Sequence, residues 1–300
     1  MATGQKGIKT ILDRVSAGEV LISDGATGTY LQQRGLEAGG CPEEFNASHP
    51  DIVRGMARDY FAAGSDIVLT NSFGGSKFMQ KKYGYEGQVE EFNRLAAEHA
   101  ASQRPSDQHF VAASVGPTGE MMEPLPDGVS ESEMYDALAE QITALADGGA
   151  DAILVETQMA LEEAVTGIRA AKENTNLPVF ATMVFDLGPR GFFTMMGVTP
   201  EKAVHDLREA GADVVGANCG NGIDKMVDLA VQMRAADDGL MLIHSNAGIP
   251  DMKGGQIIYN EGPEFMAERF KRLADMGINV LGGCCGTGPD HIRALRAAVK

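Results

Sequence analysis

Short apolar runs alternate with longer amphipathic stretches along almost the whole chain. Apolar runs of about four to eight residues between turn residues are typical of buried strands, whereas apolar residues three and four positions apart are typical of helices. The pattern predicts strands, most with the turn that follows them, at residues 20–23, 65–75, 109–119, 151–158, 177–186, 212–222, 239–248 and 278–288. It predicts helices at residues 51–64, 88–101, 132–149, 161–174, 199–211, 224–236, 262–277 and 289–299. Thr199 and Pro200 fit the cap and the first position of the helix that they begin.

Eight strands, each followed by a helix, predict an α/β protein with a (β/α)8 TIM barrel. The strands are apolar almost throughout, which is typical of a parallel sheet covered on both faces. An open, doubly wound sheet is the alternative, but the turn "DGATGT" lacks the glycine spacing of a dinucleotide-binding turn. No linker or low-complexity segment divides the sequence, so we expect residues 1–300 to form a single barrel domain.

The chain carries 25 basic and 42 acidic side chains, a formal net charge of −17. This excess of negative charge argues against nucleic acids and anionic membrane surfaces as partners. The apolar runs are shorter than the ~20 residues of a membrane span, and no signal-like leader begins the sequence, so we expect a cytoplasmic protein. In that compartment the four cysteines indicate reduced thiols or a metal site rather than a disulfide framework.

Polar residues follow several of the predicted strands. In a barrel of this type the active site lies at the carboxyl ends of the strands, so these residues are candidates for the site. Because all the strand ends point the same way, and one strand separates the sixth from the eighth, we expect the cysteines of these two strands to converge. The candidates are Asp24, Asn71, Glu156, Cys219, Asn246, Cys284 and Cys285.

Three converging thiols form a soft site that suits tetrahedral Zn²⁺, and three protein ligands leave a fourth position open, as in catalytic zinc sites. The adjacent pair requires a turn, because neighbouring side chains within a strand point to opposite faces. The glycines on both sides of Cys284 and Cys285 would permit that turn. The alternative is that the pair is incidental or redox-labile. Cys41 is interpreted as a bystander, with a fourth ligand as the alternative.

Zinc held by three thiolates carries net negative charge, which makes it a poor Lewis acid for hydrolysis. It would instead keep a substrate thiol ionised and nucleophilic, so transfer of an alkyl group to sulfur is the favoured reaction. The carboxylates of Asp24 and Glu156 are candidates to hold the ammonium group of an amino-acid substrate. The backbone amides of Gly25, Ala26 and Thr27 would receive its carboxylate. The alternative role for the two acids is turn capping.

Several motifs occur in order between Asp24 and Thr287: "DGATGT", "PEEFN", "GSDIVLTNSFGGS", "SVGPTGE", "VETQ", "GANCGNG", "SNAGIP" and "GGCCGT". With these motifs the sequence resembles the homocysteine S-methyltransferase family, which includes the homocysteine-binding barrel of cobalamin-dependent methionine synthase. The resemblance implies Zn²⁺ on Cys219, Cys284 and Cys285, with the homocysteine sulfur as fourth ligand during methionine formation. It also implies that Asp24 and Glu156 hold the substrate amino group. Asn71, Asn218 and Asn246 are expected to line the pocket.

The methyl donor is less well specified by the sequence. Tryptophan is absent, which disfavours betaine because family members that use it surround its cation with aromatic rings. The chain ends at Lys300 without room for a cobalamin or folate domain, so we expect methylcobalamin on a separate corrinoid protein, or S-methylmethionine or another sulfonium. Two alternatives remain: a methyltransferase that acts with a corrinoid protein on a different methylated substrate, and a non-catalytic barrel that binds a partner.

Overall fold

The computed structural model describes residues 10–253 and 256–300. Within these residues an eight-stranded parallel sheet follows the order β1-β12-β9-β8-β5-β4-β3-β2, which is chain order around a ring. This arrangement confirms the predicted (β/α)8 TIM barrel. The strands are β1 (Leu21–Ile22), β2 (Ile67–Leu69), β3 (Phe110–Val115), β4 (Ala152–Gln158), β5 (Val179–Met183), β8 (Val214–Cys219), β9 (Met241–Ser245) and β12 (Val280–Gly283).

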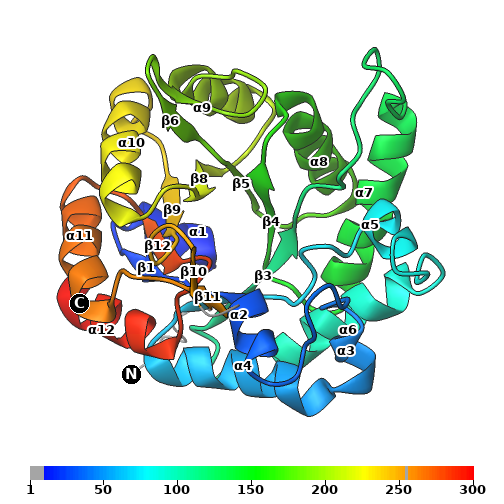
Figure 1. Ribbon diagram of the computed structural model, residues 1–300, viewed down its shortest axis with the longest axis horizontal. Helices are drawn as coiled ribbons and strands as arrows, with labels where there is room; N and C mark the ends of the chain where they lie inside the picture. Colours follow the sequence, from blue (N-terminus) through cyan, green and yellow to red (C-terminus); the bar gives the residue numbers. More distant parts are fainter. Residues whose placement is uncertain (1–9, 254–255) are drawn as a thin grey trace, which may run out of the picture.

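One long helix follows each barrel strand, and Figure 1 shows these helices surrounding the strands. They are α4 (Pro50–Ala63), α6 (Val89–Ala101), α7 (Glu131–Asp147), α8 (Leu161–Asn174), α9 (Pro200–Glu209), α10 (Ile223–Ala236), α11 (Pro263–Asp275) and α12 (Pro289–Val299). As predicted, the Thr199 side chain caps α9 by accepting the amide of Lys202. α7, with 17 residues, is the longest helix of the described ranges, and no helix there could span a bilayer.

The ring closes between β1 and β2 through two aspartates. The Asp66 amide donates to the Ile22 carbonyl at 2.7 Å, and the Ile22 amide donates to the Asp66 carboxylate at 2.9 Å. Further along the two strands, the Leu69 amide donates to Oδ2 of Asp24 at 2.8 Å. Asp24 therefore holds the first two strands together in addition to any role at the site.

The barrel interior is apolar at one end and polar at the other. Leu154 of β4, Phe180 of β5 and Val214 of β8 belong to one buried cluster together with Ile11 and Val15. Those last two residues lie in the short helix α1 (Ile11–Ser16), which closes the amino end of the barrel. Because side chains alternate along a strand, inward-facing residues two and four positions further on lie at the carboxyl end. That end is where the polar candidates gather.

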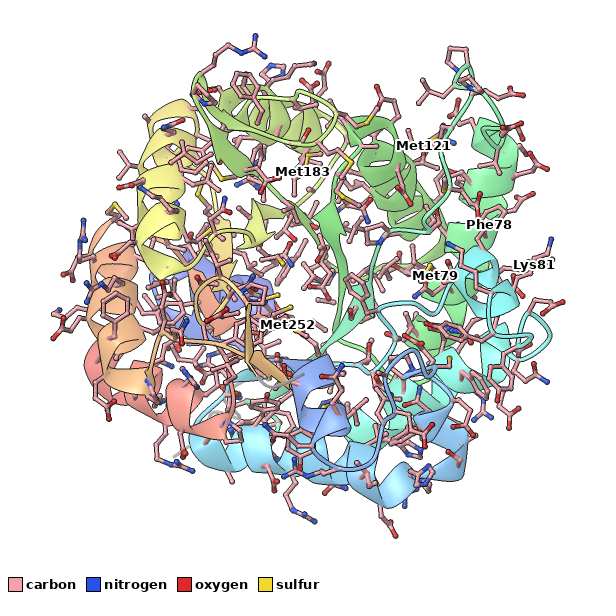
Figure 2. The ribbon with its side chains drawn as sticks, in the orientation of Figure 1. Phe78, Met79, Lys81, Met121, Met183 and Met252 are labelled. Carbon is pink, nitrogen blue, oxygen red and sulfur yellow. The ribbon has the colours of Figure 1, made fainter. Side chains whose placement is uncertain are left out.

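Two hairpins and several short helices lie between the main elements and were not predicted. The hairpin β6 (Asp186–Gly188) and β7 (Gly191–Phe193) follows β5, so the fifth strand ends at Met183 rather than at residue 186. The hairpin β10 (Asp251–Lys253) and β11 (Gln256–Ile258) follows β9. Met252 of β10 and Met121, in the loop between β3 and α7, are labelled in Figure 2 and are exposed. The short helices are α2 (Thr27–Gln32), α3 (Phe45–Ser48) and α5 (Lys77–Lys81).

Candidate active site

Strand alternation brings a set of polar side chains to the carboxyl end of the barrel. Two residues beyond Leu154 the inward position is Glu156, and four residues beyond Val214 it is Asn218. Both are buried, with exposed fractions of 6% and 1%. The same rule places His244 on β9, one step below Asn246. Burial lowers the pKa of His244 to about 3, so this side chain is neutral and serves the interior packing.

Cys219 reaches this site because its backbone departs from the strand. Val215 and Ala217 of β8 pack outward against the helix layer, and simple alternation would send Cys219 the same way. Its φ of +66° lies in the left-handed region that non-glycine residues rarely adopt. This change of direction turns the side chain toward the other two cysteines.

Cys284 and Cys285 lie on the turn after β12, as predicted. Gly286 has a φ of +81°, which gives the turn its direction. Gly282 has a different role from the one predicted, because it provides space: a Cβ there would lie 2.8 Å from Cδ2 of His244 and from Cβ of Ser23. The hydroxyl of Thr287 donates to the Cys284 carbonyl at 2.6 Å and fixes the turn.

The sulfurs of Cys219, Cys284 and Cys285 all lie within 4.8 Å of one another. Tetrahedral zinc with Zn–S bonds of ~2.3 Å holds its sulfurs about 3.8 Å apart, which fits this arrangement. The four cysteines of the chain all fall in the described part, and all are free thiols. The three residues are therefore suited to hold a metal ion, and they have the soft donor atoms that zinc accepts.

Hydrogen bonds within the cluster already favour one thiolate. Those donated by Cys284, Cys285 and the Asn246 amide hold the pKa of Cys219 well below its usual range. The same bonds raise the pKa of the Cys284 and Cys285 thiols, which act as donors. The protein thus concentrates negative charge at the point where the three sulfurs meet, as a cation site requires.

Two asparagines lie beside the cysteine sulfurs at this end of the barrel. Nδ2 of Asn218 donates to Oγ1 of Thr157 at 2.6 Å and lies 3.4 Å from Oε2 of Glu156. Nδ2 of Asn246 donates to the Gly220 carbonyl at 3.0 Å and to the Cys219 sulfur at 3.5 Å. Oδ1 of Asn246 is buried and has no partner among the described residues. Buried acceptors normally have a hydrogen-bond partner, so this unpaired oxygen beside the sulfurs can accept a hydrogen bond from a bound group.

Asp24 and Glu156 are two buried carboxyl groups with raised pKa values. Burial, followed by the charge of Glu156, raises the pKa of Asp24 to about 7. Burial, followed by the charge of Cys219, raises the pKa of Glu156 to about 7. Ser114 donates a hydrogen bond to Glu156. A cation bound beside these two desolvated carboxyl groups would stabilise their ionised forms.

The turn after β1 is placed beside the cysteine turn. The Ala26 amide already donates to the Thr287 carbonyl at 3.2 Å, and Ala26 precedes the first residue of α2, Thr27. A Cβ on Gly25 would lie 2.8 Å from Oγ1 of Thr287, so the two turns pack closely. The expected role of these amides in binding a substrate carboxylate stays a prediction.

Cys41 and Asn71 lie in a separate hydrogen-bond network. Nδ2 of Asn71 donates to the Pro42 carbonyl at 2.7 Å and to Oδ1 of Asn46 at 3.0 Å, so it holds the loop before α3. The Cys41 thiol lies 3.4 Å from acceptors of Glu43 and Gln80. Burial, followed by the charge of Glu43, raises the pKa of Cys41 to about 11. Cys41 is therefore a neutral thiol outside the three-sulfur cluster.

A family model described as homocysteine S-methyltransferase matches residues 21–299. The chain belongs to the homocysteine S-methyltransferase family. This match confirms the predicted resemblance to that family.

Two curated methionine synthases are similar to this family member. That of Mycobacterium tuberculosis (strain ATCC 25618 / H37Rv) is 32% identical over 310 residues, covering 96% of this chain and 25% of that protein. That of Mycobacterium leprae (strain TN) is 31% identical over 317 residues, covering 99% of this chain and 26% of that protein. The chain spans about a quarter of the length of these relatives.

Solved structures of the homocysteine methyltransferase MmuM from Escherichia coli have the same fold. The metallated form superimposes with a TM-score of 0.77 at 20% identity and covers 96% of this chain and 99% of that chain. The apo form gives a TM-score of 0.73, also at 20% identity, and covers 96% of this chain and 100% of that chain. These similarities support the barrel architecture of this family member.

Some residues of the candidate site were not predicted from the sequence. Strand alternation could have predicted Ser114, because it lies at an inward position of β3, four residues after Phe110. Strand alternation could also have predicted Thr182 on β5. Its hydroxyl donates to Oδ1 of Asn218 at 2.7 Å. Strand alternation could not have predicted Tyr259. It follows the unpredicted hairpin β10–β11, and its ring packs on Gly286 in the cysteine turn.

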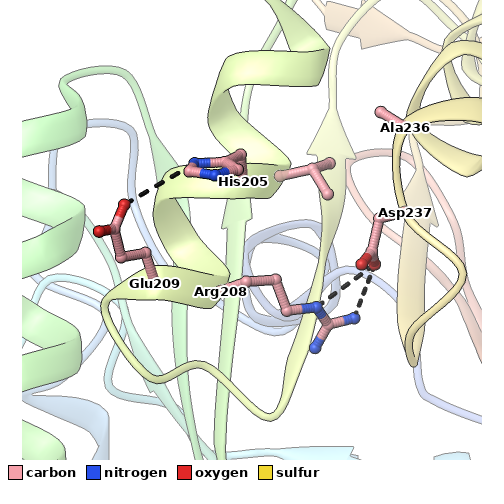
Figure 3. Close-up of a pocket in the computed structure, with 6 residues that line it drawn as sticks. His205, Arg208, Glu209, Ala236 and Asp237 are labelled. Atoms are coloured by element: carbon pink, nitrogen blue, oxygen red, sulfur yellow. Dashed lines mark hydrogen bonds and ion pairs between the residues drawn. The ribbon is translucent and has the colours of Figure 1, made fainter.

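A second group of possible metal ligands lies on α9, away from the barrel mouth. His205, Asp206 and Glu209 have ligand atoms within 4.8 Å of one another, and His205 and Glu209 border a pocket of about 420 Å³. Figure 3 shows His205 beside Glu209 and Arg208 paired with Asp237. Asp206 is paired with Lys202, and the His205 side chain is exposed. These residues form ordinary surface ion pairs of an acidic protein.

Proposed function

We propose that this chain is a zinc-dependent methyltransferase that transfers a methyl group to the thiol of homocysteine and so forms methionine. The observation that carries the proposal is the convergence of three free thiols beside two buried carboxyl groups. The sulfurs fit a metal ion, and the carboxyl groups suit an ammonium ion. Homocysteine carries both a thiol and an ammonium group, a few bonds apart.

Cys219, Cys284 and Cys285 would hold the zinc ion. Zinc bound there would supply an open position at which a substrate thiol loses its proton at neutral pH and remains nucleophilic. The amide of Asn246 orients the Cys219 sulfur through its hydrogen bond. Reduced conditions such as those of the cytoplasm would keep these thiols free.

The acidic residues would bind and orient the amino group of the substrate. Asp24 and Glu156, ionised by the approach of an ammonium ion, would accept its hydrogen bonds in the buried pocket. Ser114 and Asn218 hold Glu156 in place, and the Leu69 amide holds Asp24. With both ends fixed, the substrate sulfur would be presented to the methyl donor in a single orientation.

In the methyl transfer, the substrate sulfur forms a bond to the methyl carbon while the bond between that carbon and the donor breaks. The leaving group departs with the electron pair, and the thiol proton goes to solvent. Two donors are proposed: methylcobalamin on a separate corrinoid protein, and a sulfonium such as S-methylmethionine. Betaine is not proposed, because the chain has no tryptophan to surround a quaternary ammonium group.

A donor panel tests this proposal. Zinc-loaded protein is mixed with homocysteine and, in separate reactions, with methylcobalamin, S-methylmethionine or betaine, and methionine is measured. We expect methionine from at least one of the first two donors and none above background from betaine. A zinc-loaded protein that forms no methionine from any donor would contradict homocysteine as acceptor. It would favour a methyltransferase that works with a corrinoid protein on another methylated substrate.

A further inference from the structure

Thr157 directly follows Glu156 on β4 and has a strained backbone. Its φ of +61° lies in the left-handed region, where a β-branched residue is a marked outlier. In the described part of the chain, Asp127 and Cys219 are the other non-glycine residues with a positive φ. Strained residues persist where the surrounding contacts hold them, and they are concentrated at functional sites. Two of these three residues therefore belong to the candidate site or adjoin it.

β4 is irregular at the same point. Between two of the pairs that it makes with β5, β4 has one residue more than β5, and Glu156 and Thr157 are the residues in this interval. A β-bulge of this kind changes the direction of a side chain. Regular alternation would turn the Thr157 side chain outward, but its hydroxyl instead accepts a hydrogen bond from Asn218, which is buried inside the barrel. Thr157 thus contacts the interior next to Glu156.

Thr157 binds the Asn218 side chain at two points, across β5, which lies between β4 and β8 (Figure 1). Its amide donates to Oδ1 of Asn218 at 2.8 Å, and its hydroxyl accepts from Nδ2 at 2.6 Å. The Thr182 hydroxyl also donates to Oδ1, at 2.7 Å. Because a backbone amide can only donate, these bonds fix which end of the Asn218 side chain is the oxygen. Nδ2 therefore faces the site, 3.4 Å from Oε2 of Glu156 and 4.0 Å from Sγ of Cys284.

We propose that Thr157 is a positioning residue that sets the spacing between the two ends of the substrate pocket. The inference rests on the proposed function, in which Glu156 holds the ammonium group and the cysteines hold the metal. Asn218 directly precedes Cys219, so the two bonds join the residue after the carboxyl group to the residue before the first cysteine. A fixed spacing favours one length of substrate. Homocysteine has one methylene group more than cysteine, so the spacing would select between these two amino acids.

The test measures the binding of homocysteine and of cysteine to zinc-loaded Thr157→Val by isothermal titration. Valine keeps the β-branch and loses only the hydroxyl, so one hydrogen of the Asn218 amide loses its acceptor. We expect homocysteine to bind roughly tenfold more weakly, the lower end of the about 10–200-fold that one methylene is worth in an enzyme pocket. The affinity for cysteine and the zinc content should stay as in the wild type. The preference for homocysteine should therefore fall by the same factor.

Two further replacements separate positioning from folding. Thr157→Ser keeps the hydroxyl and should restore the preference for homocysteine. Thr157→Gly adopts a positive φ without strain, so its midpoint of thermal unfolding should not lie below that of the wild type. It lacks the hydroxyl, however, and should show the same loss of preference as Thr157→Val. A residue with a purely structural role would instead lower the stability and leave the preference unchanged.

The matched control is Thr166→Val, which removes a buried hydroxyl that donates to the Glu162 carbonyl within α8. It should change the affinity for neither amino acid. If Thr157→Val and Thr157→Gly both keep the wild-type preference, the inference is overturned. A wild-type protein that binds zinc but no homocysteine would instead overturn the proposed function, so the two failures are distinguishable.

Discussion

The Cys284→Ser variant is expected to lose stoichiometric zinc while its barrel stays folded. Serine offers a hydroxyl that is not ionised at neutral pH, so only two thiolates would remain for a soft metal ion. The loss of affinity should exceed the roughly 10–100-fold typical when only the hydrogen-bond partner of a ligand is removed. Zinc content after dialysis against a weak chelator measures the effect, and circular dichroism verifies the fold.

Cys41→Ser is the matched control for this substitution. Cys41 is likewise a free thiol, and it is buried, but its sulfur contacts Glu43 and Gln80 rather than the other cysteines. Its replacement should leave the zinc content unchanged. Equal zinc in Cys284→Ser and in the wild type would show that the metal is not held by the three-sulfur cluster.

The Glu156→Gln variant is expected to bind homocysteine roughly 10–100-fold more weakly at about pH 8. A hydrogen bond to a charged group contributes about 1.5–3 kcal/mol, and glutamine keeps the shape of the side chain but not its charge. The hydroxyl of Ser114 can still donate to the side-chain oxygen that remains. Isothermal titration of the zinc-loaded protein measures the change.

The same carboxyl groups predict a pH dependence. Burial raises the pKa of Asp24 and of Glu156 to about 7, so both groups gain protons below that value and bind an ammonium ion poorly. Affinity for the amino group should therefore rise as the pH increases through about 7. Methionine is a suitable probe because it has no thiol to titrate. In Glu156→Gln the rise should be smaller, and an equal rise would contradict the assignment.

A measurement of stability separates the effect of Glu156→Gln on binding from any effect on folding. A carboxyl group whose pKa is raised by folding stabilises the protein below its unfolded pKa and loses that contribution as the pH rises through its folded value. The unfolding free energy of Glu156→Gln should thus increase relative to the wild type between about pH 5 and pH 8.

The matched control for the binding measurement is Glu163→Gln, since Glu163 is buried, accepts two hydrogen bonds from Thr118, and lies on α8. It should leave homocysteine binding unchanged.

The parts of the fold that follow a repeating rule were predictable. Apolar runs with helices between them specified the barrel, because a parallel strand buried on both faces needs both an apolar sequence and a crossover helix. The same architecture predicted that Cys219 and the Cys284–Cys285 pair would meet, which their sulfur positions confirm. Long sequence separation was no obstacle, since all strand ends lie at one edge.

Other features depend on contacts that no local pattern encodes. The left-handed backbone of Cys219 turns its side chain away from the direction of strand alternation, and a cysteine at that position gives no sign of it in the sequence. Asp24, predicted as a site residue, also has a structural role, because it closes β1 against β2. The hairpin β10–β11 and Tyr259 lie in the loop after β9, and the end of that loop is bonded through Glu261 to Ala247 and to Ile223 of α10.

The central claim is that three cysteine sulfurs hold one zinc ion and that the substrate sulfur joins them. X-ray absorption of the zinc-loaded protein, recorded before and after homocysteine is added, measures the number of sulfur neighbours directly. We expect three sulfurs at ~2.3 Å before addition and four afterwards. A first shell of nitrogen and oxygen atoms, or a sulfur count that homocysteine does not change, would contradict the claim.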